Sequence, residues 1–300
     1  MLRQRRSRPL RDVRVAPMHA LAYYAAVPRR DRNRGQRRGT ATSDDASRVI
    51  VAGPNAVEAA LGAKPSSAIA SVYRVYLEEP APRRAHALAH QARESGVPVS
   101  TMGPGECDRV AGARCQGIAA EVAYAYADLD DLLTRDGLLI FLDSIADPHN
   151  LGAILRTAEA AGAIGAVLPE RRAAQVTATV MRVSAGAAIH LPVARVTNLV
   201  RAMQSAREAG FWLLGLSAAA DRDLPRGKAD DPRIGDRVGL ILGSEGEGMH
   251  RLVAENCDEL ARLPMRGRVE SLNASVAAAL AIYRLLDDGL FRPSGSGKRS

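Results

Sequence analysis

Residues 240–280, LILGSEGEGMHRLVAENCDELARLPMRGRVESLNASVAAAL, contain two loops with glycine, each at the end of a short apolar run. The first run, residues 238–242, leads into the loop 243–248, and the second run, residues 259–263, leads into the loop 264–273. A helical pattern follows each loop. This repeated order of strand, loop and helix predicts an α/β protein whose site lies at the carboxyl ends of its strands. Glycine in such loops lets a ligand lie against the backbone, because no Cβ stands in the way.

A third motif lies upstream, in the segment 147–156, DPHNLGAILR, which has the spacing N-x-G-x-x-x-R. Together with GSEGEGM and PM-x-G-x-x-x-SLN-x-S, it resembles the three motifs of the SpoU (TrmH-type) RNA 2′-O-ribose methyltransferases of the SPOUT class. Three motifs in this order are a specific signal, whereas a single Gly-rich loop would be a weak one. The resemblance implies an α/β fold: a SPOUT-type parallel sheet with a C-terminal trefoil knot, preceded by a small L30e-like α/β domain.

The resemblance also implies an active site that uses S-adenosyl-L-methionine as cofactor and no metal. Its catalytic residues would be Asn150, Arg156, Glu245, Ser271 and Asn273. The cofactor would lie against the two late loops, at Gly243, Gly246, Leu263, Met265 and Leu272. The residue types alone favour plainer roles. These are helix caps for the two asparagines and the serine, a solvated charge for the arginine, an exposed loop position for the glutamate and core packing for the two leucines.

Arg156 is the residue on which we expect the chemistry to depend most. A guanidinium group stays protonated in proteins and is therefore a poor general base. Its fork of donors suits the phosphate beside the target ribose, and the hydroxyl proton could then pass through that phosphate. The sequence leaves open whether Arg156 acts as a base or as a phosphate anchor. It contains no Ser/His/Asp arrangement, no metal-ligand spacing and no Walker loop.

The chain divides into five predicted segments. These are an Arg-rich disordered tail (1–47), an L30e-like RNA substrate-binding domain (48–125), a linker (126–136), the SpoU methyltransferase domain (137–292) and a disordered tail (293–300). Gly53 and Val57 match the G-x-x-x-V start of the substrate-binding domain in that family. The family often has His-Gln-Gly before the last strand of this domain. Here the histidine is replaced by Cys115, which puts an RNA contact at that position in doubt.

The methyltransferase domain shows an alternation of strands and helices. We expect strands at 137–142, 166–168, 190–193 and 211–216, and helices at 151–161, 174–184 and 198–209, before the two-loop region. This alternation predicts a parallel sheet with helices on both faces. At the first helix, Asn150 is well placed to be the N-cap.

The formal net charge of +8 is concentrated at the N-terminus. Residues 1–38 hold twelve Arg against two Asp, a sum of +10, so the remaining 262 residues sum to about −2. Such a tail suits a polyanion such as RNA. A bystander extension, or translation from Met18, explains the tail equally well, whereas the scarcity of Lys against Arg argues against the mitochondrial transit peptide that such a segment can resemble. The three scattered cysteines indicate reduced thiols and a cytoplasmic protein, and no apolar run approaches the ~18 residues of a membrane span.

We therefore expect an enzyme that methylates a ribose 2′-hydroxyl in RNA. Residues 48–290 resemble the 23S rRNA guanosine-2′-O-methyltransferases most closely, through the two-domain layout and the segment VARVTN at 193–198. A tRNA-directed relative and a resistance-type rRNA methyltransferase share the motifs and stay open, as does a non-catalytic RNA-binding assembly factor that keeps the fold. The resemblance also implies a homodimer whose interface lies beside the cofactor, where an Ala-rich helix follows Asn273.

Overall fold

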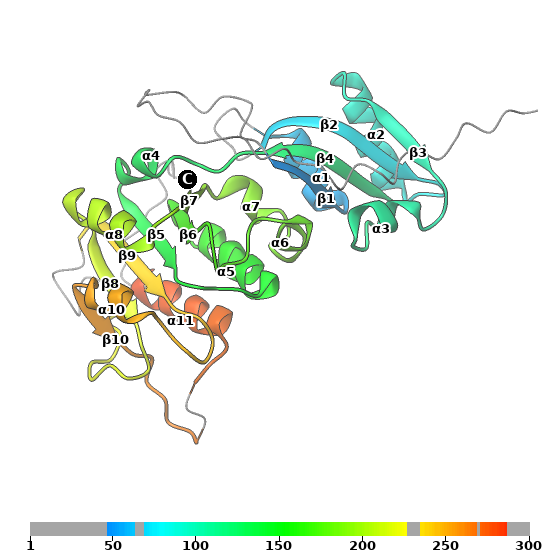
Figure 1. The fold of residues 1–300 in the computed structure, drawn as a ribbon. Helices are drawn as coiled ribbons and strands as arrows, with labels where there is room; N and C mark the ends of the chain where they lie inside the picture. The colour runs from blue at the N-terminus through cyan, green and yellow to red at the C-terminus, as the bar shows by residue number, and fades with distance from the viewer. Residues whose placement is uncertain (1–46, 64–68, 227–234, 269–270, 287–300) are drawn as a thin grey trace, which may run out of the picture. The chain divides into compact units, whose positions relative to one another are not determined.

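A computed structural model describes residues 47–63, 69–226, 235–268 and 271–286. The two predicted tails lie outside these residues, except for Ser47, which begins the first strand. Within this part of the chain the strands form two separate sheets (Figure 1). Among the described residues no helix is long and apolar enough to cross a membrane. The three cysteines are free thiols, and burial raises the pKa of Cys257 to about 12, which keeps that thiol neutral.

The first sheet has four strands in the order β1-β4-β2-β3. Its elements follow the chain as β1 (Ser47–Ala52), α1 (Pro54–Leu61), β2 (Ile69–Glu78), α2 (Arg83–Glu94), β3 (Val99–Met102), α3 (Glu106–Ala111) and β4 (Ile118–Tyr124). Strand β4 runs antiparallel to both β1 and β2, and β2 runs parallel to β3. This is the small α/β unit that the sequence predicts before the methyltransferase domain.

The second sheet has six parallel strands in the order β10-β8-β9-β5-β6-β7. They are β5 (Gly137–Leu142), β6 (Gly165–Pro169), β7 (Val193–Val196), β8 (Trp212–Leu216), β9 (Arg237–Leu242) and β10 (Glu259–Ala261). The helices of this region are α4 (Leu129–Leu133), α5 (Pro148–Ala160), α6 (Ala178–Val183), α7 (Ala187–His190), α8 (Leu199–Glu208), α10 (Arg251–Glu255) and α11 (Ala274–Leu286).

Strand β5 shows how the sequence places helices on both faces of this sheet. All six of its residues are buried, as expected for a central parallel strand. Alternate side chains enter two different cores. Leu138, Ile140 and Leu142 pack in the core that includes residues of α5 and α11, whereas Leu139 and Phe141 pack in the core that includes residues of α4 and α8. The predicted parallel sheet with two covered faces is therefore confirmed.

Three sequence predictions about local structure are wrong. Helix α5 begins at Pro148, not at residue 151, and its N-cap is Asp147, whose carboxylate accepts a hydrogen bond from the backbone N–H of His149 across 2.9 Å. Proline suits the first position of a helix, because its missing N–H has no intrahelical partner there. Asn150 is consequently inside the first turn, where its side chain is free for another role.

The other two errors lie between β6 and β7. The helix predicted at 174–184 is limited to α6, because Thr177 caps it at Val180. The strand predicted at 190–193 is displaced to β7, because residues 187–190 form the short helix α7 after Gly186, which has a left-handed φ of 88°. Residues 170–177 form a loop instead of a helical turn.

Candidate active site

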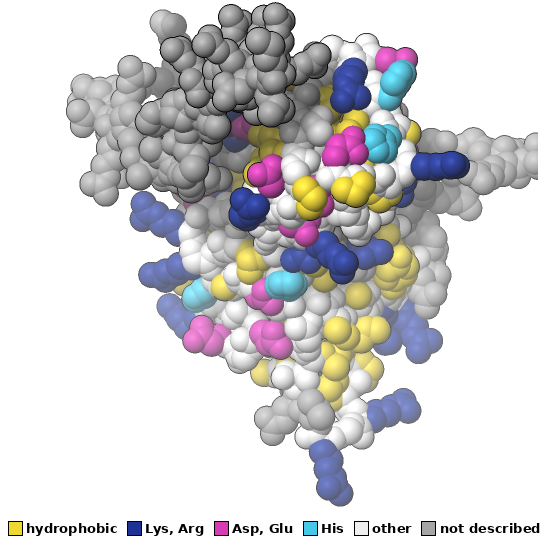
Figure 2. Space-filling view, turned by 90° about the vertical axis from the view of Figure 1, so that its right-hand side faces the viewer, with side chains coloured by type: hydrophobic (Ala, Val, Ile, Leu, Met, Phe, Trp, Pro, Cys, Tyr) yellow, Lys and Arg dark blue, Asp and Glu magenta, His cyan; other side chains and the backbone are white. Residues whose placement is uncertain are grey.

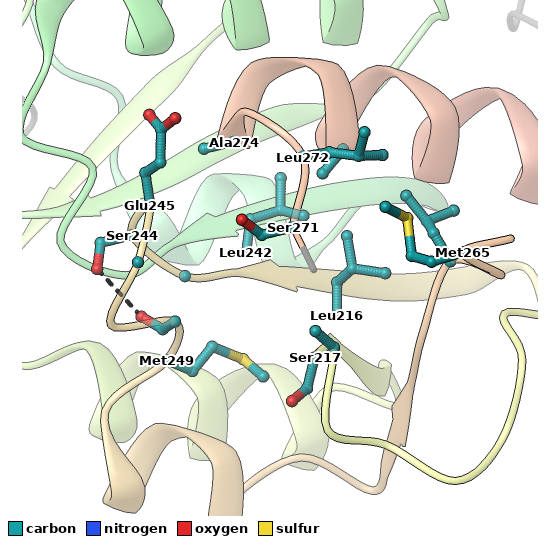
Figure 3. A pocket seen from close by; sticks show the side chains of 16 residues that line it. Leu216, Ser217, Leu242, Ser244, Glu245, Met249, Met265, Ser271, Leu272 and Ala274 are labelled. Atoms are coloured by element: carbon teal, nitrogen blue, oxygen red, sulfur yellow. Dashed lines mark hydrogen bonds between the residues drawn. The ribbon is translucent and has the colours of Figure 1, made fainter. Parts of the chain in front are cut away.

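The two late loops line one cavity of about 400 Å³, at the carboxyl ends of β8, β9 and β10. Figure 3 shows the side chains around it, with Leu216, Met265 and Leu272 pointing toward one another and the Glu245 carboxylate at the opposite end of the row. Seven predicted site residues line this cavity: Gly243, Glu245, Gly246, Leu263, Met265, Ser271 and Leu272. Ala274 and Ala277 of α11 complete one wall.

The first loop is a tight turn that requires its glycines. Ser244 and Gly248 exchange backbone hydrogen bonds of 2.9 and 3.1 Å, and the Ser244 hydroxyl also donates to the Gly248 carbonyl. Gly246 and Gly248 have φ values of 88° and 70°, which residues with a Cβ rarely adopt. At Gly243 a Cβ would come within 2.2 Å of the Gly248 backbone. The loop therefore folds back on its own start and leaves backbone at the cavity wall.

Three side chains from the three sequence motifs meet beside this loop. Asn150 donates from Nδ2 to Oε2 of Glu245 across 3.2 Å, and Asn273 donates from Nδ2 to Oδ1 of Asn150 across 3.0 Å. Asn273 lies 3.3 Å from the same Glu245 oxygen and donates to it too. No described residue donates to the other carboxylate oxygen, Oε1. The network therefore fixes the carboxylate on one side and leaves its second oxygen open to a ligand.

Ser275 orients this network and was not among the predicted site residues. Its hydroxyl donates to Oδ1 of Asn273 across 2.6 Å, and the same oxygen accepts the backbone N–H groups of Ser275 and Val276 at the start of α11. Because Oδ1 is held by these donors, Nδ2 of Asn273 must face Asn150 and Glu245. The repeated serine in SLNAS was the available signal, but the Ala-rich run that follows it suggested only close helix packing.

Asp143 is a second residue that the sequence did not identify. It follows β5 directly, is buried, and accepts a 2.7 Å hydrogen bond from the backbone N–H of His250, just after the glycine loop. The His250 ring Nδ1 lies 2.9 Å from the same carboxylate. This contact ties the end of the glycine loop to the segment that leads into Asn150. A buried acid directly after an apolar strand is a signal that sequence reading could have used.

Arg156 is not part of the network. It is exposed on α5 and forms no hydrogen bond or ion pair with a described residue. One turn earlier on the same helix face, Gly152 packs so closely on α6 that a Cβ would come within 2.7 Å of Val183. Helical side chains lean toward the N-terminus of their helix, which directs the Arg156 stem toward the motif that contains Asn150. Ser271 is also exposed, and its side chain forms no hydrogen bond with a described residue.

The lining of the cavity suits a cofactor such as S-adenosylmethionine. A volume of about 400 Å³ lies in the range of small-molecule sites. Apolar side chains of leucine and methionine offer contact to a flat base, and the loop backbone offers hydrogen bonds. Glu245 is the only charged residue among the described residues of the lining, and its negative charge suits a cationic ligand. The described residues contain no cluster of acidic, His and Cys side chains that could hold a metal ion.

Comparisons with known proteins agree with this geometry. The family model described as "SpoU rRNA Methylase family" matches residues 137–283, and the one described as "RNA 2′-O ribose methyltransferase substrate binding" matches residues 50–127. A 23S rRNA (guanosine-2′-O-)-methyltransferase RlmB of Photobacterium profundum is 38% identical over 79% of this chain and 96% of that protein. YacO of Bacillus subtilis, named as a TrmH family tRNA/rRNA methyltransferase, is 41% identical over 71% of this chain and 87% of its own.

Solved structures show the same fold. The crystal structure of the SpoU methyltransferase AviRb from Streptomyces viridochromogenes aligns with a TM-score of 0.66 at 25% identity, over 79% of this chain and 88% of that one. A second structure of AviRb, in complex with AdoMet, aligns with a TM-score of 0.67 at 23% identity, over 84% and 92% of the two chains. The family matches, the full-length relatives and the shared fold all agree, and this chain belongs to the SpoU family of RNA 2′-O-ribose methyltransferases.

Proposed function

We propose that the chain methylates the 2′-hydroxyl of a guanosine in 23S rRNA, with S-adenosylmethionine as methyl donor. The proposal rests first on the hydrogen-bonded network of Asn150, Glu245 and Asn273, because it brings three distant motifs to the edge of one cavity. The choice of RNA is supported by the RlmB of Photobacterium profundum, of which this chain covers 96%. A bacterial rRNA substrate would place the enzyme in the cytoplasm.

The cavity residues would hold the cofactor. Leu263, Met265 and Leu272 would contact its adenosine part, and the backbone at Gly243 and Gly246 would approach it closely. When bound, S-adenosylmethionine supplies an electrophilic methyl group. The protein needs only to orient the ribose oxygen in line with that group and to assist removal of the hydroxyl proton.

Glu245 would orient the ribose. Its Oε2 atom is held by the two asparagine amides, so Oε1 stays in a fixed position where it can accept a hydrogen bond from the 2′-hydroxyl. Arg156 would bind the phosphate next to that ribose with its fork of donors. Ser271, at the cavity wall, would donate to the ribose or to the cofactor. These groups act by positioning, and the hydrogen bonds among Asn150, Glu245 and Asn273 are formed before substrate arrives.

We also include a homodimer in this proposal, with α11 as the interface. Val276, Leu280 and Tyr283 are spaced four and three residues apart, and each is about half exposed, at 47, 50 and 54%. They form an apolar stripe on the side of α11 that faces away from the core. Ala274 and Ala277 of the same helix line the cavity, so a second copy packed on the stripe would lie beside the cofactor. The trefoil knot implied by the family remains part of the proposal.

The substrate is tested by mapping 2′-O-methylation in RNA from a strain that lacks the gene. We expect one guanosine of 23S rRNA to lose its methyl group and to regain it when the wild-type gene is restored, but not when Glu245→Gln is supplied. Loss of a methyl group in tRNA alone would redirect the proposal to a tRNA substrate. Unchanged methylation in both RNAs would contradict it.

A further inference from the structure

The arginines of the methyltransferase domain differ in whether a carboxylate of the same chain pairs with them. Along the later part of the chain, five arginines pair with carboxylates: Arg207, Arg222, Arg237, Arg251 and Arg262. Between Asp143 and Val196 there are five more, and none of these forms an ion pair with a described residue: Arg156, Arg171, Arg172, Arg182 and Arg195. Figure 2 shows the same mixture on one face, with some Lys and Arg side chains beside acidic ones and others apart from them.

Two of these five arginines, Arg171 and Arg172, are neighbours in sequence. They are adjacent in the loop after β6, and both are exposed. Arg172 has a φ of 60°, in the left-handed region that is unfavourable for a residue with a long side chain. Glu170 precedes them but pairs with neither. Two neighbouring guanidinium groups repel each other, so an arrangement without a carboxylate partner suits an anionic ligand from outside the chain.

Hydrogen bonds from Gln175 and Tyr126 hold the loop that carries these two arginines in place. The Gln175 amide donates to the carbonyls of Pro169 and Ala173, and its oxygen accepts the Tyr126 hydroxyl. The same hydroxyl accepts the backbone N–H of Val176 across 3.0 Å. Burial raises the pKa of Tyr126, so the hydroxyl stays protonated and able to donate. The two arginines therefore extend from a braced loop, which limits the entropy lost when they bind a ligand.

This loop lies next to the first motif. Strands β5 and β6 are neighbours in the parallel sheet, so the loops that follow them share one edge. Ala174 donates from its backbone N–H to the carbonyl of Ile145 across 2.8 Å. Ile145 precedes the α5 cap, Asp147, by two residues, and Asn150 follows in the first turn. A strand of RNA whose ribose reaches Asn150 and Glu245 would pass this edge of the sheet.

We propose that Arg171 and Arg172 form a phosphate-binding site for the RNA strand that flanks the target nucleotide. The ligand class is the RNA phosphodiester backbone, which an arginine pair recognises by charge and by bidentate hydrogen bonds. The site would set the register of the strand, while Asn150, Glu245 and Asn273 act on the ribose. This inference rests on the proposed function, since it takes RNA as the substrate.

The test compares full-length wild-type protein with Arg171→Ala, Arg172→Ala and the double variant. Binding of a fluorescein-labelled 23S rRNA fragment is measured by anisotropy over a series of salt concentrations, and S-adenosylmethionine binding is measured by calorimetry. We expect the double variant to bind the fragment at least about tenfold more weakly. The slope of log K against log salt should become shallower by about 0.7 to 0.9 for each arginine removed. Cofactor affinity should stay unchanged.

Arg135→Ala is the matched control. Arg135 is also exposed and forms no ion pair with a described residue, but it lies just before β5, at the opposite edge of the sheet. It should change neither the affinity nor the salt slope, and Arg171→Lys with Arg172→Lys should restore most of the slope. An RNA affinity and slope in the double variant equal to those of Arg135→Ala would overturn the proposal. Because this readout needs no methyl transfer, it can fail or succeed independently of the proposed function.

Discussion

Asn273 donates a 3.0 Å hydrogen bond to Asn150, which is 123 residues earlier in the chain. This contact joins the first turn of α5 to the start of α11, and both side chains also donate to Glu245. Each asparagine uses its Nδ2 donor for a network that no helix requires. The arrangement therefore favours a functional role for these polar groups, which come from the first turn of α5, the loop after β9 and the start of α11.

Asn273→Asp should lower turnover without unfolding α11. The new side chain keeps Oδ1, which accepts the N–H groups of Ser275 and Val276, so the helix cap remains. It loses the Nδ2 donor and brings a second carboxylate next to Glu245. We expect kcat to fall about 10- to 100-fold, or about 1.4 to 2.7 kcal/mol, with little change in the melting temperature.

Asn198→Asp is the control for that substitution, because Asn198 caps α8 through the same kind of hydrogen bond, to the N–H of Arg201, away from the site. Steady-state kinetics and thermal unfolding of both variants would provide the comparison. Equal and near-native turnover in the two variants would mean that the network does not contribute to catalysis.

Gly243→Ala should abolish cofactor binding. A Cβ at this position would lie within 2.4 Å of three backbone atoms of Gly248 and Met249, which cannot move without opening the turn. Gly267→Ala is the matched control, since a Cβ there meets nothing within 4 Å and its φ is not in the left-handed region. Calorimetry with S-adenosylmethionine should show binding by the second variant only. Normal binding by Gly243→Ala would show that the cofactor lies elsewhere.

Arg156→Ala should abolish methyl transfer and leave cofactor affinity largely intact. The guanidinium would meet the negative RNA backbone, whereas a cationic cofactor would be repelled by it. Removal of such a group costs about two to three powers of ten in rate, or about 3–4 kcal/mol. Arg156→Lys should rescue little, because an ammonium group cannot form the bidentate contact. If Arg156→Ala kept near-native turnover on its RNA while Glu245→Ala did not, the phosphate anchor would have to be another residue.

Leu280→Asp should convert the proposed dimer into a monomer. The substitution places a charge in the middle of the apolar stripe on α11, where a partner subunit would have to desolvate it. Leu252→Asp, at a similarly exposed leucine on α10, should leave assembly unchanged. Light scattering of the two variants and the wild type measures the mass directly. If the wild-type protein is monomeric at working concentration, α11 is not a dimer interface.

The sequence predicted those elements best whose pattern is decided locally. The apolar run at β5 has the predicted bounds, 137–142, because its own pattern and the glycine at its start define it locally. The start of α5 was missed because two residues, Asp147 and Asn150, are both good caps, and only the chain geometry decides between them.

Site residues that belong to a sequence motif could be predicted. Contacts between residues that are far apart in sequence could not. Glu245 and Asn273 could be named from their motifs, but the two hydrogen bonds that join them to Asn150 follow from the order of strands in the sheet. The contact of Asp143 with His250 joins residues 107 positions apart and has no local signature beyond a buried acid. The sequence predicted a helix from residue 174, where the structure has the end of the loop that carries Arg171 and Arg172. The hydrogen bond between Val176 and the Tyr126 hydroxyl in this loop therefore could not be foreseen.

We propose that this protein transfers a methyl group to a ribose oxygen of RNA through the Asn150–Glu245–Asn273 site. The most direct measurement incubates the purified protein with S-adenosylmethionine labelled in the methyl group and with 23S rRNA lacking the modification, and then hydrolyses the RNA in alkali. A 2′-O-methyl group blocks cleavage of the adjacent phosphodiester bond, so the label should appear in alkali-resistant dinucleotides with the wild type and be strongly reduced with Asn273→Asp. Label in mononucleotides, or no transfer to RNA by a protein that binds the cofactor, would contradict the claim.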